Sequence, residues 1–88
     1  MLLPIPLSTE NVEMTPAQCR AARALVDLTQ PKLAQEAALG LSTVVDFERA
    51  RRTVSAEAVA AIRAALEAAG VEFTNGEQPG VRLRKVGA

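Results

Sequence analysis

Residues 28–48, LTQPKLAQEAALGLSTVVDFE, contain two short helix patterns on either side of one glycine. The first pattern starts at Thr29, a favoured N-cap residue, and Pro31 is tolerated because it lies in the first helical turn. Apolar residues then recur at helical spacing and predict a short helix that ends around residues 37–39. The side chains expected to face inward are Leu33, Ala34 and Ala37.

Gly40 interrupts this pattern, and a second short helix is predicted over residues 41–48. Val44 and Phe47 lie one turn apart in that segment and are expected to face the core. The stretch therefore predicts two short helices joined by a tight turn.

The segment before this pair carries a strong helix start. Thr15, Pro16 and Gln18 supply an N-cap, a first-turn proline and the second member of a capping box. The stripe that this helix is expected to bury consists of Ala21, Ala24, Leu25 and Leu28. Residues 1–14 contain two prolines and are interpreted as an irregular arm, apolar enough to dock as an edge strand.

The segment after the pair predicts one long helix and a hairpin. Ser55 is the expected N-cap of an Ala-rich helix over residues 56–69, and Gly70 is its expected stop. The apolar stripe of this helix consists of Val59, Ile62 and Leu66. Apolar and polar residues then alternate at 71–73 and 81–84, with turn residues between them, which is typical of a β-hairpin.

Three parts are therefore expected: the arm at 1–14, a helical domain at 15–70, and a hairpin with its tail at 71–88. A lone two-stranded ribbon is marginal in water. The hairpin is therefore expected to lie on the helices or to pair with another strand, which makes it a candidate dimerisation element.

The composition argues against catalysis and metal binding. The chain of 88 residues has no His and a single cysteine, Cys19, so the commonest general base and any multi-cysteine zinc site are missing. Cys19 lies in an Ala-rich helical stretch and is interpreted as a small buried side chain. We therefore expect no enzymatic activity, no metal and no cofactor.

The charge and hydropathy patterns narrow the choice of partners. Ten Lys and Arg residues balance ten Asp and Glu residues, so binding to a polyanion would have to rest on a local basic patch. No apolar run reaches membrane-spanning length and no signal-peptide pattern is present, so a cytoplasmic protein that does not enter a membrane is expected.

Spacing alone leaves two interpretations of the helix pair open: an ordinary small bundle, or a pair that presents its second helix to DNA. The segments Leu28-Thr29-Gln30, Leu33-Ala34 and 42–49, STVVDFER, closely resemble the helix-turn-helix of the Cro/C1-type (XRE) regulator family. The resemblance spans about residues 17–69. It implies a mainly α, lambda-repressor-like bundle of about four helices, here with a C-terminal β-hairpin. It also implies a bacterial transcription regulator, activator or repressor, that binds double-stranded DNA through its third helix. The small core and the hairpin add the expectation of a homodimer.

The resemblance assigns candidate DNA contacts. Gln30, at the start of the second helix, matches a phosphate-contacting Gln, the alternative being a solvent-exposed capping residue. Leu41, Ser42, Val45 and Asp46 occupy outward positions of the third helix, where the family touches base edges. Ser42 would hydrogen-bond a base, and Leu41 or Val45 would contact a thymine methyl. Asp46 would repel phosphates unless it accepts from a cytosine amino group or a neighbouring Arg, so a structural role is its alternative.

Further candidates are expected to contact the DNA backbone. Thr43 lies on the same helix and is either a phosphate contact or a solvated side chain. Arg49, Arg51 and Arg52 follow that helix and are candidate phosphate contacts, the alternative being a solvated charged surface. Arg20 is an open choice between the same two roles.

Arg23 and Glu48 match family positions that pair across the first and third helices, so the resemblance implies a structural ion pair that holds the third helix at its angle. Two departures from the family pattern also have consequences. The family usually has Gly at the position of Ala38, and a left-handed Ala costs roughly 1 kcal/mol, so a reshaped turn is one expectation. It often has a long polar residue at the position of Leu41, so a weaker base-reading face is another. The alternative function is a protein-interaction module, antitoxin-like or anti-activator, with weak or lost DNA binding.

Overall fold

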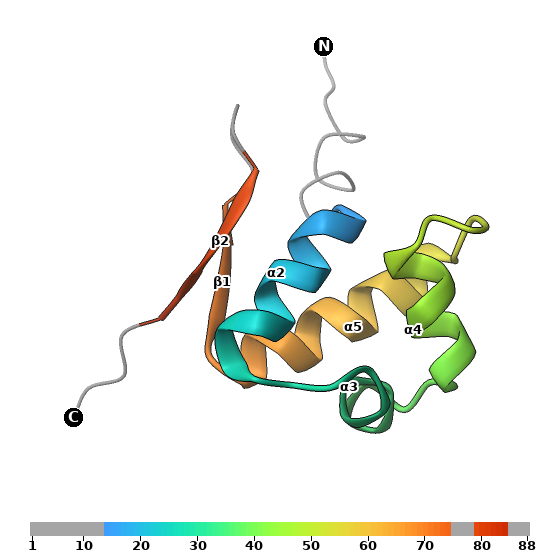
Figure 1. Ribbon diagram of the computed structural model, residues 1–88, viewed down its shortest axis with the longest axis horizontal. Coiled ribbons are helices and arrows are strands. Elements are labelled where there is room, and N and C mark those ends of the chain that lie inside the picture. Colours follow the sequence, from blue (N-terminus) through green and yellow to red (C-terminus); the bar gives the residue numbers. More distant parts are fainter. Residues whose placement is uncertain (1–13, 75–78, 85–88) are drawn as a thin grey trace, which may run out of the picture.

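The computed structural model describes residues 14–74 and 79–84. These residues contain the helices α2 (Pro16–Val26), α3 (Gln30–Ala37), α4 (Leu41–Glu48) and α5 (Ala56–Ala68), followed by the strands β1 (Val71–Thr74) and β2 (Gly80–Leu83) (Figure 1). A mainly helical fold with a C-terminal hairpin is therefore confirmed. The predicted arm lies outside the described residues except for Met14, and so do residues 75–78 of the predicted hairpin turn and the tail at 85–88.

Hydroxyl side chains begin three of these helices, as predicted. Each N-cap oxygen accepts the backbone N–H of the residue three positions later, which satisfies a donor that the helix itself leaves unpaired. The caps are Thr15 to Gln18 (3.0 Å), Thr29 to Lys32 (3.2 Å) and Ser55 to Ala58 (3.1 Å). In the first of them the Gln18 side chain also accepts the Thr15 N–H at 2.8 Å, so the predicted capping box is complete.

Left-handed residues end or follow three of the helices. Asp27, Ala38 and Ala50 have φ angles of 54°, 60° and 54°. At Ala38 two hydrogen bonds close the end of α3, from the Ala38 N–H to Gln35 O (3.1 Å) and from the Leu39 N–H to Ala34 O (2.9 Å). This is the pattern that glycine usually completes. The turn at Ala38 therefore keeps the left-handed conformation despite its Cβ.

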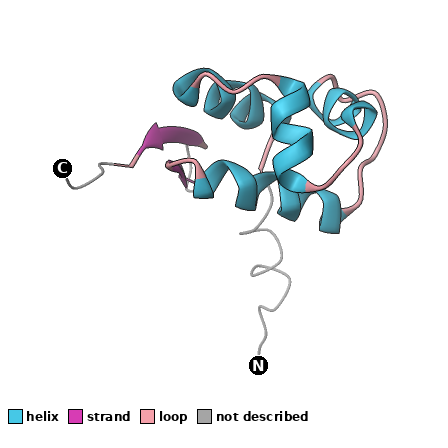
Figure 2. Cartoon of the chain, turned by 90° about the horizontal axis from the view of Figure 1, so that it is seen from below, coloured by secondary structure: helices cyan, strands magenta, loops and turns pink. Residues whose placement is uncertain are grey.

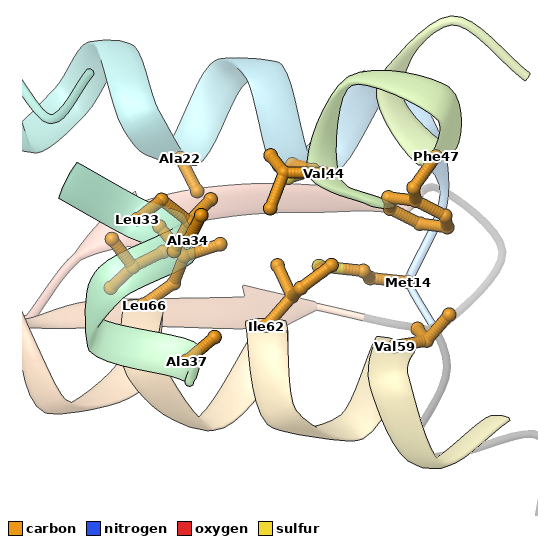
Figure 3. Close-up of a cluster of buried hydrophobic side chains, with 12 residues drawn as sticks. Met14, Ala22, Leu33, Ala34, Ala37, Val44, Phe47, Val59, Ile62 and Leu66 are labelled. Carbon is orange, nitrogen blue, oxygen red and sulfur yellow. The ribbon is translucent and has the colours of Figure 1, made fainter. Parts of the chain in front are cut away.

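The core lies where the four helices meet, and its side chains come from all of them (Figure 3). The predicted inward residues of α3, α4 and α5 are confirmed: Leu33, Ala34, Ala37, Val44, Phe47, Val59, Ile62 and Leu66 are buried. Met14, just before α2, is buried as well. In the described part of the chain, no helix is long and apolar enough to cross a membrane.

The predicted buried stripe of α2 is wrong except at Leu28, which lies after the helix and packs against the core. Ala21, Ala24 and Leu25 are exposed and Leu28 is half-buried, whereas the inward residues are Gln18, Cys19 and Ala22. The reason is that two polar groups on this face have partners inside the protein. The Gln18 amide donates to two carbonyl oxygens of the hairpin, and the Cys19 thiol donates to a carboxylate on α4.

The hairpin is antiparallel, with Val71 opposite Leu83 and Thr74 opposite Gly80. It lies at one end of the helical part of the molecule, on the far side of α2 from α4 (Figures 1 and 2). The Gln18 amide nitrogen fixes it to α2 through Thr74 O (3.2 Å) and Gly80 O (3.0 Å). The hairpin therefore lies on the helices, while α4 faces away from it.

Candidate functional site

Helix α4 has one face in the core and one in solvent. Val44, Phe47 and Glu48 are buried, whereas Leu41 is 45% exposed and Ser42 is also exposed. The other three candidate side chains of this helix, Thr43, Val45 and Asp46, are half-buried. The apolar spacing of α4 therefore predicted its inner face correctly, and the candidate base-reading residues lie on or beside its outer face.

Glu48 connects α4 to α2. Its carboxylate is only 2% exposed and receives the Arg23 guanidinium through two hydrogen bonds, from Nε to Oε2 (2.7 Å) and from Nη2 to Oε1 (2.9 Å). Arg23 also donates to the Leu28 carbonyl oxygen at 3.1 Å, in the link between α2 and α3. Arg23 and Glu48 thus form an ion pair at the positions where the resemblance implies one, and Arg23 joins α2 to α4 and to the link between α2 and α3.

Gln30 is a second partner of this carboxylate. It is the first residue of α3, it is half-buried, and its Nε2 donates to Glu48 Oε1 at 2.9 Å. The N-cap of α3 is Thr29, so the alternative of Gln30 as a solvent-exposed capping residue is wrong. A side-chain amide nitrogen carries two hydrogens, and Glu48 engages one of them. The carboxylate therefore fixes the orientation of the Gln30 amide and leaves its second hydrogen available.

Cys19 completes the surroundings of Glu48, with Sγ 3.0 Å from Oε2. Burial of Glu48 acts to raise its pKa, but hydrogen bonds from Arg23, Cys19 and Gln30, with the charge of Arg23, outweigh burial and hold the pKa below the ordinary value of 4.5. Burial, together with the hydrogen bond to Glu48 and its charge, raises the pKa of the Cys19 thiol far above its ordinary value. Cys19 is therefore a neutral, fully buried thiol, in line with its interpretation as a small core side chain.

Four arginines surround the C-terminal end of α4. Arg49 caps the helix, Arg51 and Arg52 follow it, and Arg20 on α2 donates to the Glu48 carbonyl oxygen in the last turn. All four are exposed. We call Arg20, Arg49, Arg51 and Arg52 the basic cluster.

Positive charge at this end of a helix is favourable for the helix dipole, and exposed guanidinium groups are also available to anions. The sequence leaves the role of Arg20 open between phosphate contact and solvated surface, because nothing in it shows that Arg20 reaches the end of another helix. The signal that points to this role is the spacing of Arg20 and Arg23, one turn apart on α2.

Asp46 lies beside the basic cluster and has arginine partners of its own. Its Oδ2 is 2.8 Å from Arg52 Nε, and its Oδ1 is 4.0 Å from Arg51 Nη1. The predicted alternative, a carboxylate that accepts from a neighbouring Arg, is the arrangement found. Asp46 is therefore engaged within the protein and is poorly placed to read a base.

The remaining chemistry of the site is limited. Among the described residues, no group of three or more His, Cys, Asp and Glu side chains could hold a metal ion. Every buried side-chain nitrogen and oxygen in the same part of the chain has a hydrogen-bond partner. What the site offers to a ligand is a set of exposed donors and cations around the outer face of α4.

No family model matches this chain, and no curated protein matches it either.

Proposed function

We propose that this chain is a DNA-binding transcription regulator in which α3 and α4 act as a helix-turn-helix and α4 enters the major groove. The observation that carries the proposal is the shared attachment at Glu48. Its carboxylate orients Gln30 at the start of α3, and its carbonyl oxygen holds Arg20 of the basic cluster. Phosphate-binding donors thus adjoin an exposed helix face, which is the arrangement that a groove-reading helix needs.

The start of α3 is the proposed phosphate site. Pro31 has no N–H, and the Lys32 N–H is capped by Thr29, so the Gln30 backbone N–H is the first-turn donor left for a ligand. The second hydrogen of the Gln30 amide adds a side-chain donor next to it. Together with the helix dipole, these two donors suit one phosphate oxygen.

The outer face of α4 is the proposed base-reading surface. Leu41 and Ser42 are its most exposed residues, and Val45 lies beside them. Leu41 and Val45 suit the methyl group of thymine, while the Ser42 hydroxyl both donates and accepts. This surface favours sites rich in A·T pairs, because it has no guanidinium for the two acceptors of guanine.

A homodimer is part of the proposal, with two copies of α4 in successive major grooves about 34 Å apart. The hairpin is the candidate contact because β1 and β2 form a two-stranded sheet in the described part of the chain, so each strand has a neighbouring strand on one edge only. Leu83 on β2 is also exposed, so strand pairing between copies would bury apolar surface.

The salt dependence of DNA binding tests the proposal. The double variant Arg51→Ala/Arg52→Ala should bind every duplex more weakly, and the slope of log K against log salt should fall by about 1.8. The matched control is Arg51→Lys/Arg52→Lys, which keeps both charges and should keep most of the slope. Unchanged affinity and slope in the alanine variant would remove both arginines from the site.

A second candidate function is a protein-interaction module. The observation that favours it is the apolar character of the outer face of α4, where Leu41 and Val45 adjoin a carboxylate, Asp46, that offsets nearby arginines. In that case the Leu41→Ser variant would lose a protein partner while the arginine variants would not. Removal of residues 1–13 would show whether the arm is the interaction surface, because unchanged partner binding would exclude it.

A further inference from the structure

Asp46 contacts the loop that carries Arg51 and Arg52, two members of the basic cluster, through both its backbone and its side chain. Ala50 adopts a left-handed conformation just after α4, which turns the chain back so that the Arg51 N–H donates to Asp46 O at 2.9 Å. The same turn places Arg52 Nε 2.8 Å from Asp46 Oδ2 and Arg51 Nη1 4.0 Å from Oδ1. The backbone reversal therefore places Arg51 and Arg52 close enough for their guanidinium groups to reach this carboxylate.

The exposure of these groups shows that they remain accessible to a ligand. The side chains of Arg51 and Arg52 are 60% and 50% exposed, while that of Asp46 is 21% exposed. An exposed pair of this kind adds little to stability, since its attraction is screened by water and salt. A carboxylate and a phosphate both accept side-on hydrogen bonds from a guanidinium group.

We propose that Asp46 is an internal competitor for DNA phosphates that limits the affinity of this protein for duplex DNA of any sequence. In the free protein its carboxylate takes the place on Arg52 that a phosphate oxygen takes in the complex. The negative charge also offsets one of the four charges of the basic cluster, so one fewer phosphate is effectively neutralised. This inference rests on the proposed DNA-binding function and assigns to Asp46 a role other than base reading.

The variant Asp46→Asn isolates this charge. It has the same shape, it keeps the backbone bond to Arg51, and its side-chain oxygen still accepts from Arg52 Nε, so the loop remains ordered. The matched control is Glu67→Gln, which removes a carboxylate that is also bonded to an arginine Nε, that of Arg63, at 2.9 Å. Glu67 lies near the C-terminal end of α5, about 16 Å along the helix from Ala56, the end that follows Arg51 and Arg52 in the chain.

The experiment measures the affinity of the wild-type chain and the two variants for a fluorescent random-sequence duplex between 50 and about 300 mM salt. Asp46→Asn should bind roughly eightfold more tightly near 0.1 M salt, because one additional neutralised phosphate adds about 0.9 to the salt slope. Glu67→Gln should match the wild type. Far-UV circular dichroism of each variant establishes that it is folded.

The outcomes separate the inference from the function it rests on. If the wild type binds and Asp46→Asn binds no more tightly, or more weakly, Asp46 is not a competitor, and a weaker complex would mean that it positions the arginines productively. An equal gain in Glu67→Gln would also overturn the inference, because net charge alone would explain the effect. If none of the three folded proteins binds duplex DNA, the proposed function itself fails, and the inference fails with it.

Discussion

Arg23 and Glu48 form a bidentate ion pair between α2 and α4, with Nε 2.7 Å from Oε2 and Nη2 2.9 Å from Oε1. Glu48 is one residue away from the basic cluster, and it also orients Gln30. The pair therefore sets the position of the outer face of α4 relative to the start of α3. It is the structural element on which the proposed DNA-binding geometry depends.

Loss of one member of this pair should destabilise the fold strongly. Arg23→Ala leaves the nearly fully buried Glu48 carboxylate without its counter-charge, and the free energy of unfolding should fall by about 3–5 kcal/mol. The double variant Arg23→Met/Glu48→Leu should recover most of that loss, because no buried charge remains. Urea unfolding measures the stability of both variants. Circular dichroism is the signal to follow, because the chain has neither Trp nor Tyr to give intrinsic fluorescence.

A loss of 5 kcal/mol is comparable to the whole stability of many small domains, so Arg23→Lys is a useful third variant. This variant keeps the charge and loses the bidentate geometry. Its free energy of unfolding should lie between those of the wild type and Arg23→Ala. A loss below about 1 kcal/mol for Arg23→Ala would mean that the pair behaves like one at the surface, contrary to this account.

The stability of the fold should decrease in acid because of Glu48. Its pKa is lower in the folded protein than in the unfolded chain, so its contribution is fully present above about pH 4.5 and is lost as the pH falls through the folded-state pKa. Glu48→Gln cannot titrate, and its unfolding free energy should depend less steeply on pH below 4.5. Parallel slopes for the wild type and Glu48→Gln between pH 5 and about 3 would exclude Glu48 as a source of the acid sensitivity.

Two alanines are in a backbone conformation that favours glycine. Ala38 and Ala50 have φ angles of 60° and 54°, where the Cβ is strained. Ala38→Gly and Ala50→Gly should each raise the free energy of unfolding by about 0.5–1 kcal/mol, since the relief of strain exceeds the added entropy of the unfolded chain.

The control for this pair is Ala60→Gly, an exposed position inside the right-handed helix α5. The same change there should lower the stability by about 1 kcal/mol. If all three glycine variants were destabilised alike, the left-handed turns after α3 and α4 would be contradicted.

The sequence was sufficient for the elements whose signals are local. The caps Thr15, Thr29 and Ser55 and the apolar spacing of α3, α4 and α5 predicted the helices and the inner faces of the last three. These signals depend on residues within one or two turns of each other. Local signals therefore give the order of the elements and most of the core.

Apolar spacing predicted the wrong buried face for α2, because residues far away in the sequence determine which face of this helix is buried. Gln18 is buried because hairpin carbonyls accept from its amide, and these lie 56 and 62 residues further along the chain. Cys19 is buried against Glu48, 29 residues away. No periodicity of hydrophobic residues reports such contacts, and the more apolar stripe with Leu25 was the wrong choice.

In the candidate site, too, some features were predicted from the sequence, and those that depend on tertiary packing were not. The resemblance implied the pairing of Arg23 with Glu48, and spacing placed Leu41 and Ser42 on the outer face of α4. The bond between Gln30 and Glu48 depends on the packing angle between α3 and α4. Such an angle follows from tertiary contacts, so it could not be read from either helix alone.

The most direct test of the proposed function is selection from a random-sequence pool of duplex DNA with the purified protein. The selection would be run at low and at near-physiological salt, and the bound DNA would be sequenced. We expect enrichment of a two-fold symmetric motif whose half-sites lie about one turn of DNA apart, because two copies of α4 would occupy successive major grooves. A folded sample that enriches no motif at either salt concentration would contradict sequence-specific DNA binding and would favour the protein-interaction module.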